Sequence, residues 1–186
     1  MAIDPVLAEC ETRMKKAVQA LQDELATIRT GRASPALIEH LHVEAYGVST
    51  PLNQLASITA PEARLLVVQP WDPHLLGAIE KAILKSDLGL NPTNDGRVIR
   101  VVIPYLSEER RKELIRITRK KVEEGRVAVR AHRHDALETM ERMQKNKEIS
   151  EDDFKRGKER LQKLTDTYIA KVDEVGAHKE EEILEV

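Results

Sequence analysis

The segment RTGRASP, residues 29–35, ends a helical pattern that fills the first part of the chain. Gly31 is a natural helix stop because glycine adopts the left-handed conformation at helix ends without steric penalty, and Pro35 follows it closely. The helical pattern does not resume until Ser107. The residues between favour short strands and turns. The sequence therefore predicts one helical unit built from both ends of the chain, with a second compact unit inserted after the first helix.

Charge density separates the same two parts. Of the 74 residues 31–104, 13 are Asp, Glu, Lys or Arg, against 49 of the other 112. The formal net charge of the whole chain is −2, which excludes a globally basic protein. An interaction with nucleic acid would therefore have to depend on a local basic surface.

The cysteine content and the lack of targeting segments indicate the cellular compartment. Cys10 is the single cysteine, so no internal disulfide can form, as is usual in a reducing environment. The first residues lack the pattern of a signal peptide, and no apolar run approaches the ~20 residues that span a bilayer. We expect a soluble cytoplasmic protein.

Three long helices are expected. The first should run over 5–29, about 37 Å, with Asp4 as its N-cap and Pro5 at its first position. The second should begin after Ser107 and run to about residue 145, and the third should run from Ser150 to about residue 183. Apolar residues recur every three or four positions in each helix. The expected buried stripes are Leu7, Cys10, Met14, Val18, Leu21, Leu25 and Ile28; Ile115, Thr118, Val122, Gly125, Val129, His132, Ala136, Met140 and Met143; and Phe154, Leu161, Leu164, Tyr168, Val172 and Val175.

The middle unit is expected to be small and rich in β-structure. Four segments of β-branched and apolar residues predict strands, with a helix over 74–85 and Gly89 as its left-handed cap. Asp95-Gly96 indicates a tight turn. The predicted strands are 42–46, 52–59, 64–69 and 98–103.

The expected fold class is therefore α+β: a long antiparallel three-helix bundle of residues 1–30 and 105–186, carrying a small α/β domain of residues 31–104. Hinges are expected near 30–34 and 103–106, where two strands of chain join the units. The candidate hinge residues are Thr30, Gly31, Arg32, Ser34, Pro35, Pro104 and Tyr105.

Catalytic and cofactor motifs are absent from the sequence. It contains no phosphate-binding glycine loop, no nucleophile elbow and no zinc-ligand spacing. His40 and His42 would share one face of a strand, but further metal ligands are lacking nearby. We expect a protein that is not an enzyme and that needs no metal or cofactor.

Basic residues form a row on the predicted second helix. Arg119, Arg126, Arg130 and Arg133 fall within about 60° of one another on a helical wheel, and Lys112 continues the row. One interpretation is an ordinary solvated face with ion pairs, since Glu123 lies on the same side. The alternative is a surface that follows phosphates of a nucleic-acid backbone. Aromatic residues are too few for base stacking, so that target would be structured RNA.

Five segments of the chain resemble the bacterial ribosome recycling factor family: RTGRASP at 29–35, SDLGLNP at 86–92, LSEERRK at 106–112, RVAVR at 126–130 and KEISED at 147–152. The resemblance covers essentially the whole chain in order. It implies an L-shaped protein whose bundle binds the large ribosomal subunit across the tRNA sites and contacts 23S ribosomal RNA. It also implies that elongation factor G engages the small domain, and that the two factors with GTP split the post-termination 70S ribosome and release mRNA and tRNA.

Carried over residue by residue, the resemblance assigns RNA contact to Arg130 and Arg133, with Arg126 and Arg119 along the same face. The match is interrupted after residue 130, and His134 stands where many members have a second arginine. A monomer with no membrane partner is implied. Two other interpretations remain open: a coiled-coil scaffold or chaperone-like arm that binds proteins, and an enzyme in the inserted unit that uses His40, His42 and Asp72.

Overall fold

The computed structural model describes residues 1–185 and divides the chain into two compact units. One consists of Met1–Arg29 together with the chain from Ser107 onward, and the other of Thr30–Leu106. The small unit therefore begins one residue before, and ends two residues after, the interval 31–104 expected from the sequence.

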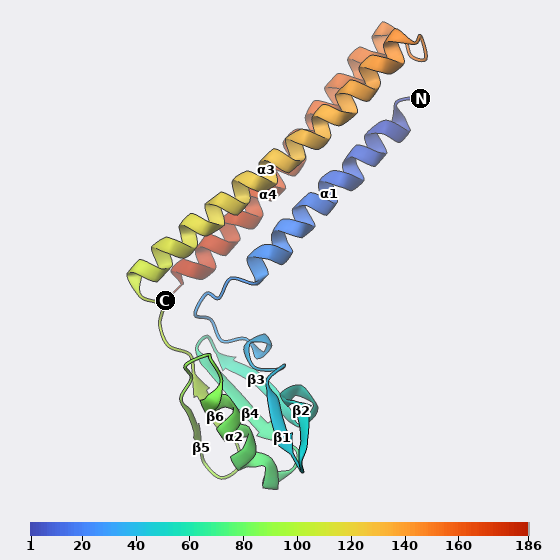
Figure 1. Ribbon diagram of the computed structural model, residues 1–186. Helices are drawn as coiled ribbons and strands as arrows, with labels where there is room; N and C mark the ends of the chain where they lie inside the picture. The colour runs from blue at the N-terminus through green and yellow to red at the C-terminus, as the bar shows by residue number, and fades with distance from the viewer. Residues whose placement is uncertain (186) are drawn as a thin grey trace. The chain divides into compact units, whose positions relative to one another are not determined.

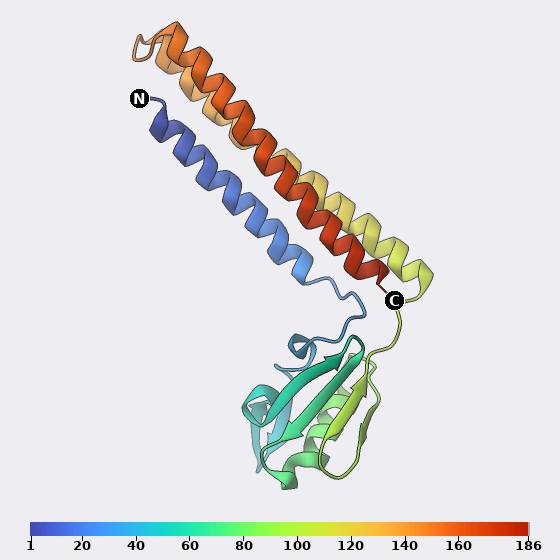
Figure 2. The ribbon, with the colours of Figure 1, turned by 180° about the vertical axis from the view of Figure 1, so that it is seen from behind.

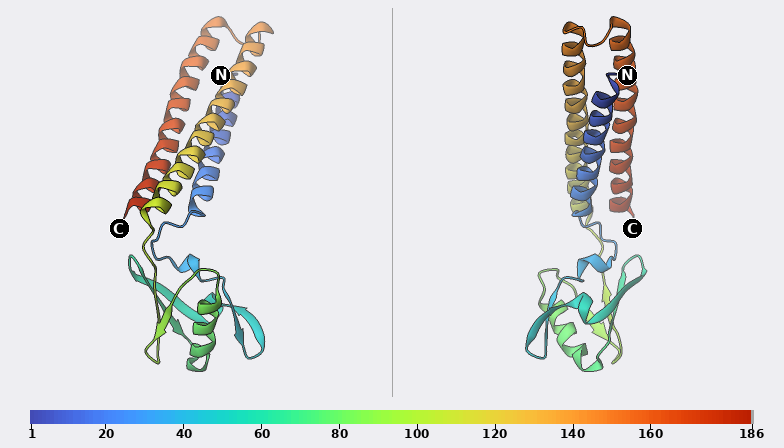
Figure 3. Two further views of the ribbon diagram at one scale, coloured as in Figure 1. Left: turned by 60° about the vertical axis from the view of Figure 1, so that its left-hand side comes forward. Right: turned by 90° about the vertical axis from the view of Figure 1, so that its right-hand side faces the viewer.

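The first unit is a bundle of three long helices. They are α1 (Asp4–Ala26), α3 (Glu108–Lys145) and α4 (Glu151–Leu184). A short turn joins α3 to α4, which run antiparallel, and α1 lies against both of them (Figures 1 and 3). The predicted antiparallel three-helix bundle is confirmed.

The starts of α3 and α4 are set by serine caps, as expected. The Ser107 hydroxyl accepts a hydrogen bond from the backbone N–H of Arg110 at 3.1 Å, and the Ser150 hydroxyl accepts one from that of Asp153 at 3.0 Å. Each bond satisfies an N–H group that has no partner within the helix.

Both predicted ends of α1 are wrong. Ile3, whose side chain cannot form a capping bond, occupies the N-cap, and Asp4 is the first helical residue. The Asp4 carboxylate instead accepts hydrogen bonds from the N-terminal amino group and from Arg160 of α4. At the other end the Thr27 hydroxyl donates to the Glu24 carbonyl at 2.7 Å, and the helix stops at Ala26 although the apolar spacing continues to Ile28.

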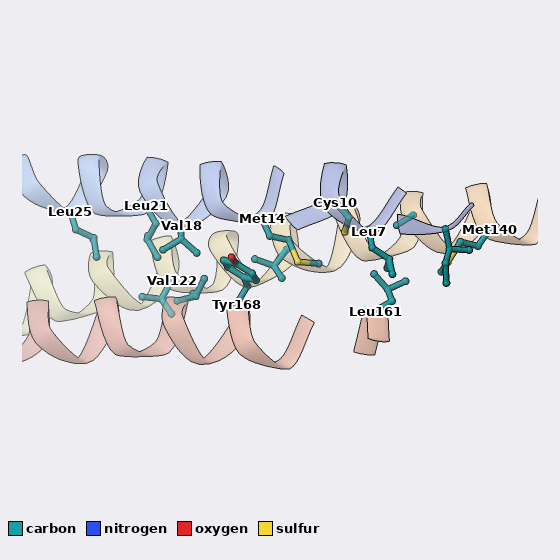
Figure 4. Close-up of a cluster of buried hydrophobic side chains, with 14 of the residues drawn as sticks. Leu7, Cys10, Met14, Val18, Leu21, Leu25, Val122, Met140, Leu161 and Tyr168 are labelled. Carbon is teal, nitrogen blue, oxygen red and sulfur yellow. The ribbon is translucent and has the colours of Figure 1, made fainter. Parts of the chain in front are cut away.

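The bundle core follows the predicted stripes closely (Figure 4). On α3 the buried residue near the start is Leu114 and not Ile115, and His132 and Met143 are only half-buried. Tyr168 is the largest fully buried side chain, and its hydroxyl donates to the Glu11 carboxylate at 2.9 Å. Burial first, and this hydrogen bond second, raise the pKa of Tyr168 to about 12.

The second unit contains a four-stranded antiparallel sheet in the order β3-β4-β6-β5 and a separate two-stranded hairpin. Helix α2 (Leu76–Lys85) packs against one face of the larger sheet (Figure 2). A second hydrophobic core fills this unit. The strands are β1 (His42–Ala45), β2 (Val48–Pro51), β3 (Ala56–Glu62), β4 (Leu65–Pro70), β5 (Pro92–Asn94) and β6 (Ile99–Val102).

The predicted small α/β domain is confirmed, but several of its details differ. Strands β2 and β5 were not expected, and Leu52–Gln54 forms a 3-10 turn where a strand was predicted. Gly96 has a φ of +90°, as the predicted turn requires. Gly89 is also left-handed, with a φ of +66°, but α2 ends at Lys85 with Ser86 as its C-cap, so Gly89 is not its cap.

Candidate nucleic-acid interface

The arginine row of α3 lies along the seam between α3 and α4. The Arg119 Nε atom donates to Glu180 Oε1 at 2.8 Å, and the Arg126 Nε atom donates to Asp173 Oδ1 at 2.8 Å. A second Arg126 nitrogen lies 2.6 Å from the same Asp173 oxygen. Both acids belong to α4, so these two arginines join the helices to each other.

Arg126 pairs with two carboxylates. It donates to Glu123 of its own helix at 2.9 Å as well as to Asp173, and only 33% of its side chain is exposed. The hydrogen bond to Glu123, followed by that to Asp173, raises the pKa of Arg126 above its ordinary value. A phosphate could bind this guanidinium only by displacing a carboxylate.

Arg130 and Lys112 are held more loosely. Arg130 lies 3.6 Å from Glu123, with 58% of its side chain exposed, and Lys112 lies 3.4 Å from Glu108 in a well-exposed pair. Exposed pairs at these distances stabilise a protein by at most about 1 kcal/mol. Both cations therefore remain able to attract an anion.

Arg133 differs from every other member of the row. Within residues 1–185 it forms no ion pair, and its half-buried side chain places Nε out of contact with solvent and without a hydrogen-bond partner. A buried N–H group without a partner is unfavourable, and a guanidinium offers five donors in a planar fork suited to carboxylate or phosphate. Arg133 is the guanidinium of the row best prepared to receive an external anion.

The sequence left two interpretations of the row open, and the structure shows which of its arginines already have ion-pair partners. Arg119 and Arg126 are paired, as on an ordinary solvated face, whereas Arg133 is open. The missed residues are Asp173 and Glu180, which lie seven apart on α4 as Arg119 and Arg126 do on α3. The equal spacing on the two predicted helices was a signal that could have identified these pairs.

The chain that enters the small unit is bound to that unit within a few residues. Gly31 has a φ of +76°, and a Cβ atom added there would lie 3.2 Å from Leu106 Cγ. The backbone N–H of Ala33 donates to the carbonyl of Ala63 at 2.7 Å, and the Ser34 hydroxyl caps the 3-10 turn Pro35–Leu37.

The chain that leaves the small unit is bound in the same way. The backbone N–H of Ile103 donates to the carbonyl of Arg64 at 2.7 Å, and the Arg64 guanidinium stacks 3.0 Å from the centre of the Tyr105 ring. Of the candidate hinge residues, Ser34, Pro35 and Tyr105 thus make contacts within the small unit.

Of the residues named for a metal or an enzyme site, Asp72 and His40 have local partners. Asp72 accepts hydrogen bonds from the Tyr46 hydroxyl and from the backbone N–H of His74, and exposed His40 lies beside Glu39. In the described chain no three His, Cys, Asp or Glu residues are grouped so that they could hold a metal ion. Among the same residues, no helix has the length and apolar character needed to cross a membrane.

Comparison with known proteins decides the family. The family model described as "Ribosome recycling factor" matches residues 21–184. The chain belongs to the ribosome recycling factor family. Ribosome-recycling factors of Roseiflexus sp. (strain RS-1) and Chloroflexus aurantiacus are 56% and 54% identical over 184 residues, which is 99% of this chain and 100% of each relative.

Solved structures of the family share the fold. A solution structure of the ribosome recycling factor is 47% identical, with a TM-score of 0.71 over 100% of this chain and 99% of that chain. A second structure is described as models for the T. thermophilus ribosome recycling factor and the E. coli elongation factor G bound to the E. coli post-termination complex. Its recycling factor is 50% identical, with a TM-score of 0.63 over 99% of this chain and 100% of that chain. Members of the family are non-enzymatic translation factors.

Proposed function

We propose that the chain recycles ribosomes after translation termination. It binds the large subunit across the tRNA sites of the post-termination complex and, with elongation factor G and GTP, splits the ribosome so that mRNA and tRNA are released. Family membership over nearly the whole chain supports this function. The structure described as models for the T. thermophilus recycling factor and elongation factor G bound to a post-termination complex supports the two partners.

The observation that carries the proposal at the level of residues is the open guanidinium of Arg133. Arg133 forms no ion pair within residues 1–185, so its guanidinium could bind a phosphate without first displacing a carboxylate. Arg130 and, more weakly, Lys112 add positive charge along the same helix, and the chain acts on 23S ribosomal RNA through these groups. Arg119 and Arg126 serve mainly to fasten α3 to α4.

The bundle acts as a stiff arm. Its helices pack so closely at Gly176 that an added Cβ atom would lie 2.5 Å from Val122 Cγ2, and interhelix ion pairs run along one seam. Elongation factor G acts on the small unit, which turns at the two chain segments that connect it to the bundle. The hinges are near 30–34 and 103–106, where the chain passes from one unit to the other. The chain works as a monomer in the cytoplasm.

Replacement of Arg133 by alanine tests this function. We expect Arg133→Ala to weaken ribosome binding by about 1–3 kcal/mol, the usual value of a charge-assisted contact to phosphate. Co-sedimentation with ribosomes over a series of salt concentrations should also show a shallower dependence on salt, by roughly one phosphate contact. Arg119→Ala is the matched control, because Arg119 is already paired, and it should lose less affinity.

Two results would argue against the proposal. An unchanged affinity of Arg133→Ala would remove this residue from the interface. A wild-type chain that stays in the supernatant at every salt concentration would favour the scaffold interpretation. Circular dichroism should show that both variants keep the helix content of the wild type, because these side chains are partly exposed and stabilise the fold only weakly.

A further inference from the structure

The interhelix ion pairs define a regular register along the seam between α3 and α4. Arg119 faces Glu180 and Arg126 faces Asp173, so each step moves seven residues along α3 and seven in the opposite direction along α4. The next equivalent pair of positions is 133 and 166. The helices stay in step beyond this point, because a Cβ atom on Gly157 would lie 2.8 Å from Met140 Sδ.

The third pair of positions carries the right residues but forms no ion pair. Arg133 has no partner among residues 1–185, and Asp166 Oδ1 instead accepts a hydrogen bond at 2.9 Å from Gln162 Nε2, one turn earlier on its own helix. The equivalent positions before the two paired acids are Ile169 and Gly176, neither of which has a side-chain donor. Gln162 thus gives the third acid a neighbouring side-chain donor on its own helix that the two paired acids lack at the same spacing.

We propose that Gln162 is a positioning residue: it holds the Asp166 carboxylate away from Arg133 and so keeps that guanidinium open for an RNA phosphate. This inference rests on the proposed function for its biological meaning. A carboxylate and a phosphate compete for the same fork of donors, so an Arg133–Asp166 pair would have to be broken before RNA could bind. A hydrogen bond between side chains four residues apart is a small interaction, and it is enough to bias an exposed carboxylate between two nearby donors.

Removal of the amide tests the proposal. Gln162→Ala should let Asp166 pair with Arg133 and lower ribosome affinity about two- to fivefold, the range over which an exposed ion pair competes. In a chain that also carries Asp166→Asn no carboxylate remains to compete. The double variant should therefore bind as tightly as Asp166→Asn alone.

The chain provides a matched control. Gln19 Nε2 donates to Asp23 Oδ1 at 2.9 Å on α1, which is the same residue pair at the same spacing and distance on another helix. Gln19→Ala should leave ribosome affinity unchanged. If Gln162→Ala binds like Gln19→Ala, or if its loss persists when Asp166→Asn is present, the positioning role is wrong.

A measurement without ribosomes separates this inference from the proposed function. NMR relaxation of the Arg133 Nε–Hε group in the free protein should show a more ordered guanidinium in Gln162→Ala than in the wild type. No gain in order overturns the role of Gln162. If order increases but wild-type binding to ribosomes does not depend on Arg133, the positioning role stands and the proposed use of Arg133 fails.

Discussion

The closeness of α3 and α4 can be tested by adding a single methyl group at Gly176. A Cβ atom at this position would lie 2.5 Å from Val122 Cγ2, whereas carbon atoms in contact prefer about 3.5–4.0 Å. Val122 is β-branched and has essentially one rotamer in a helix, so it cannot turn aside. In Gly176→Ala one helix must therefore move by about 1 Å to restore ordinary contact.

The change in stability of Gly176→Ala is the difference between a packing cost and a gain in helix propensity. Overpacking of a well-filled interface costs about 1–3 kcal/mol, and replacing a helical glycine by alanine returns about 1 kcal/mol. We expect the free energy of unfolding of Gly176→Ala to fall by about 1 kcal/mol. Gly157→Ala is the matched control, because its nearest neighbour is the flexible end of Met140, at 2.8 Å. It should be neutral or slightly stabilising, since methionine adapts readily to changes in packing.

Urea unfolding followed by circular dichroism at 222 nm, which reports mainly on the bundle, measures both variants. A double-mutant cycle with Val122→Ala then tests the stated cause. With the valine methyl groups removed, Gly176→Ala should become stabilising, which gives a coupling energy of about 1–3 kcal/mol. The reasoning is refuted if Gly176→Ala is as stable as the wild type, or if its cost is the same whether or not Val122 is present.

Three further results are expected. The pKa of Tyr168 is raised to about 12, so the stability that its neutral form contributes is fully present below the ordinary phenol pKa of about 10 and is lost as pH rises through 12. In an equilibrium titration of tyrosinate absorbance, the step near pH 12 should be missing in Tyr168→Phe. Hydrogen bonds from the backbone N–H groups of Val98 and Arg97, and then from Arg100, lower the pKa of Asp95 to about 2. The stability that the Asp95 carboxylate contributes is therefore present above the ordinary pKa of about 4 and is lost as pH falls to 2. Urea unfolding of the small unit should show that Asp95→Asn is less stable than the wild type at pH 7 and equally stable near pH 2. Gly31→Ala places a residue with a side chain in a left-handed backbone conformation beside Leu106, which costs about 1–2 kcal/mol. Subunit splitting should slow, while ribosome binding measured by co-sedimentation is retained. Equal loss of splitting and binding would contradict a hinge at this position.

The helical part of the fold was largely predictable because its signals are local. Ser107 and Ser150 stand directly before long periodic segments, and their side chains cap α3 and α4 as their positions suggest. The end of α1 was misplaced because the apolar spacing continues past Ala26 to Ile28, while the bond from Thr27 to the Glu24 carbonyl, which accompanies the stop, leaves no mark in the periodicity.

The parts that escaped prediction depend on partners distant in sequence. Strands β2 and β5 are short and contain Pro51 and Pro92, which argue locally against strands, and only pairing with β1 and β6 makes them part of a sheet. The arginine row was visible on one helix, but which of its members form ion pairs depends on residues of α4, some 47 to 61 positions away. Periodicity gives the exposed face of a helix and not the register of its neighbour.

Subunit splitting, followed by light scattering with purified ribosomes, elongation factor G and GTP, tests most directly the claim that the bundle grips ribosomal RNA through Arg133. The wild-type chain should lower the scattering only when both the elongation factor and GTP are present. At the same limiting concentration, Arg133→Ala should fail to split ribosomes while Arg119→Ala remains active. Undiminished splitting by Arg133→Ala, or no splitting by the wild type, would contradict the claim.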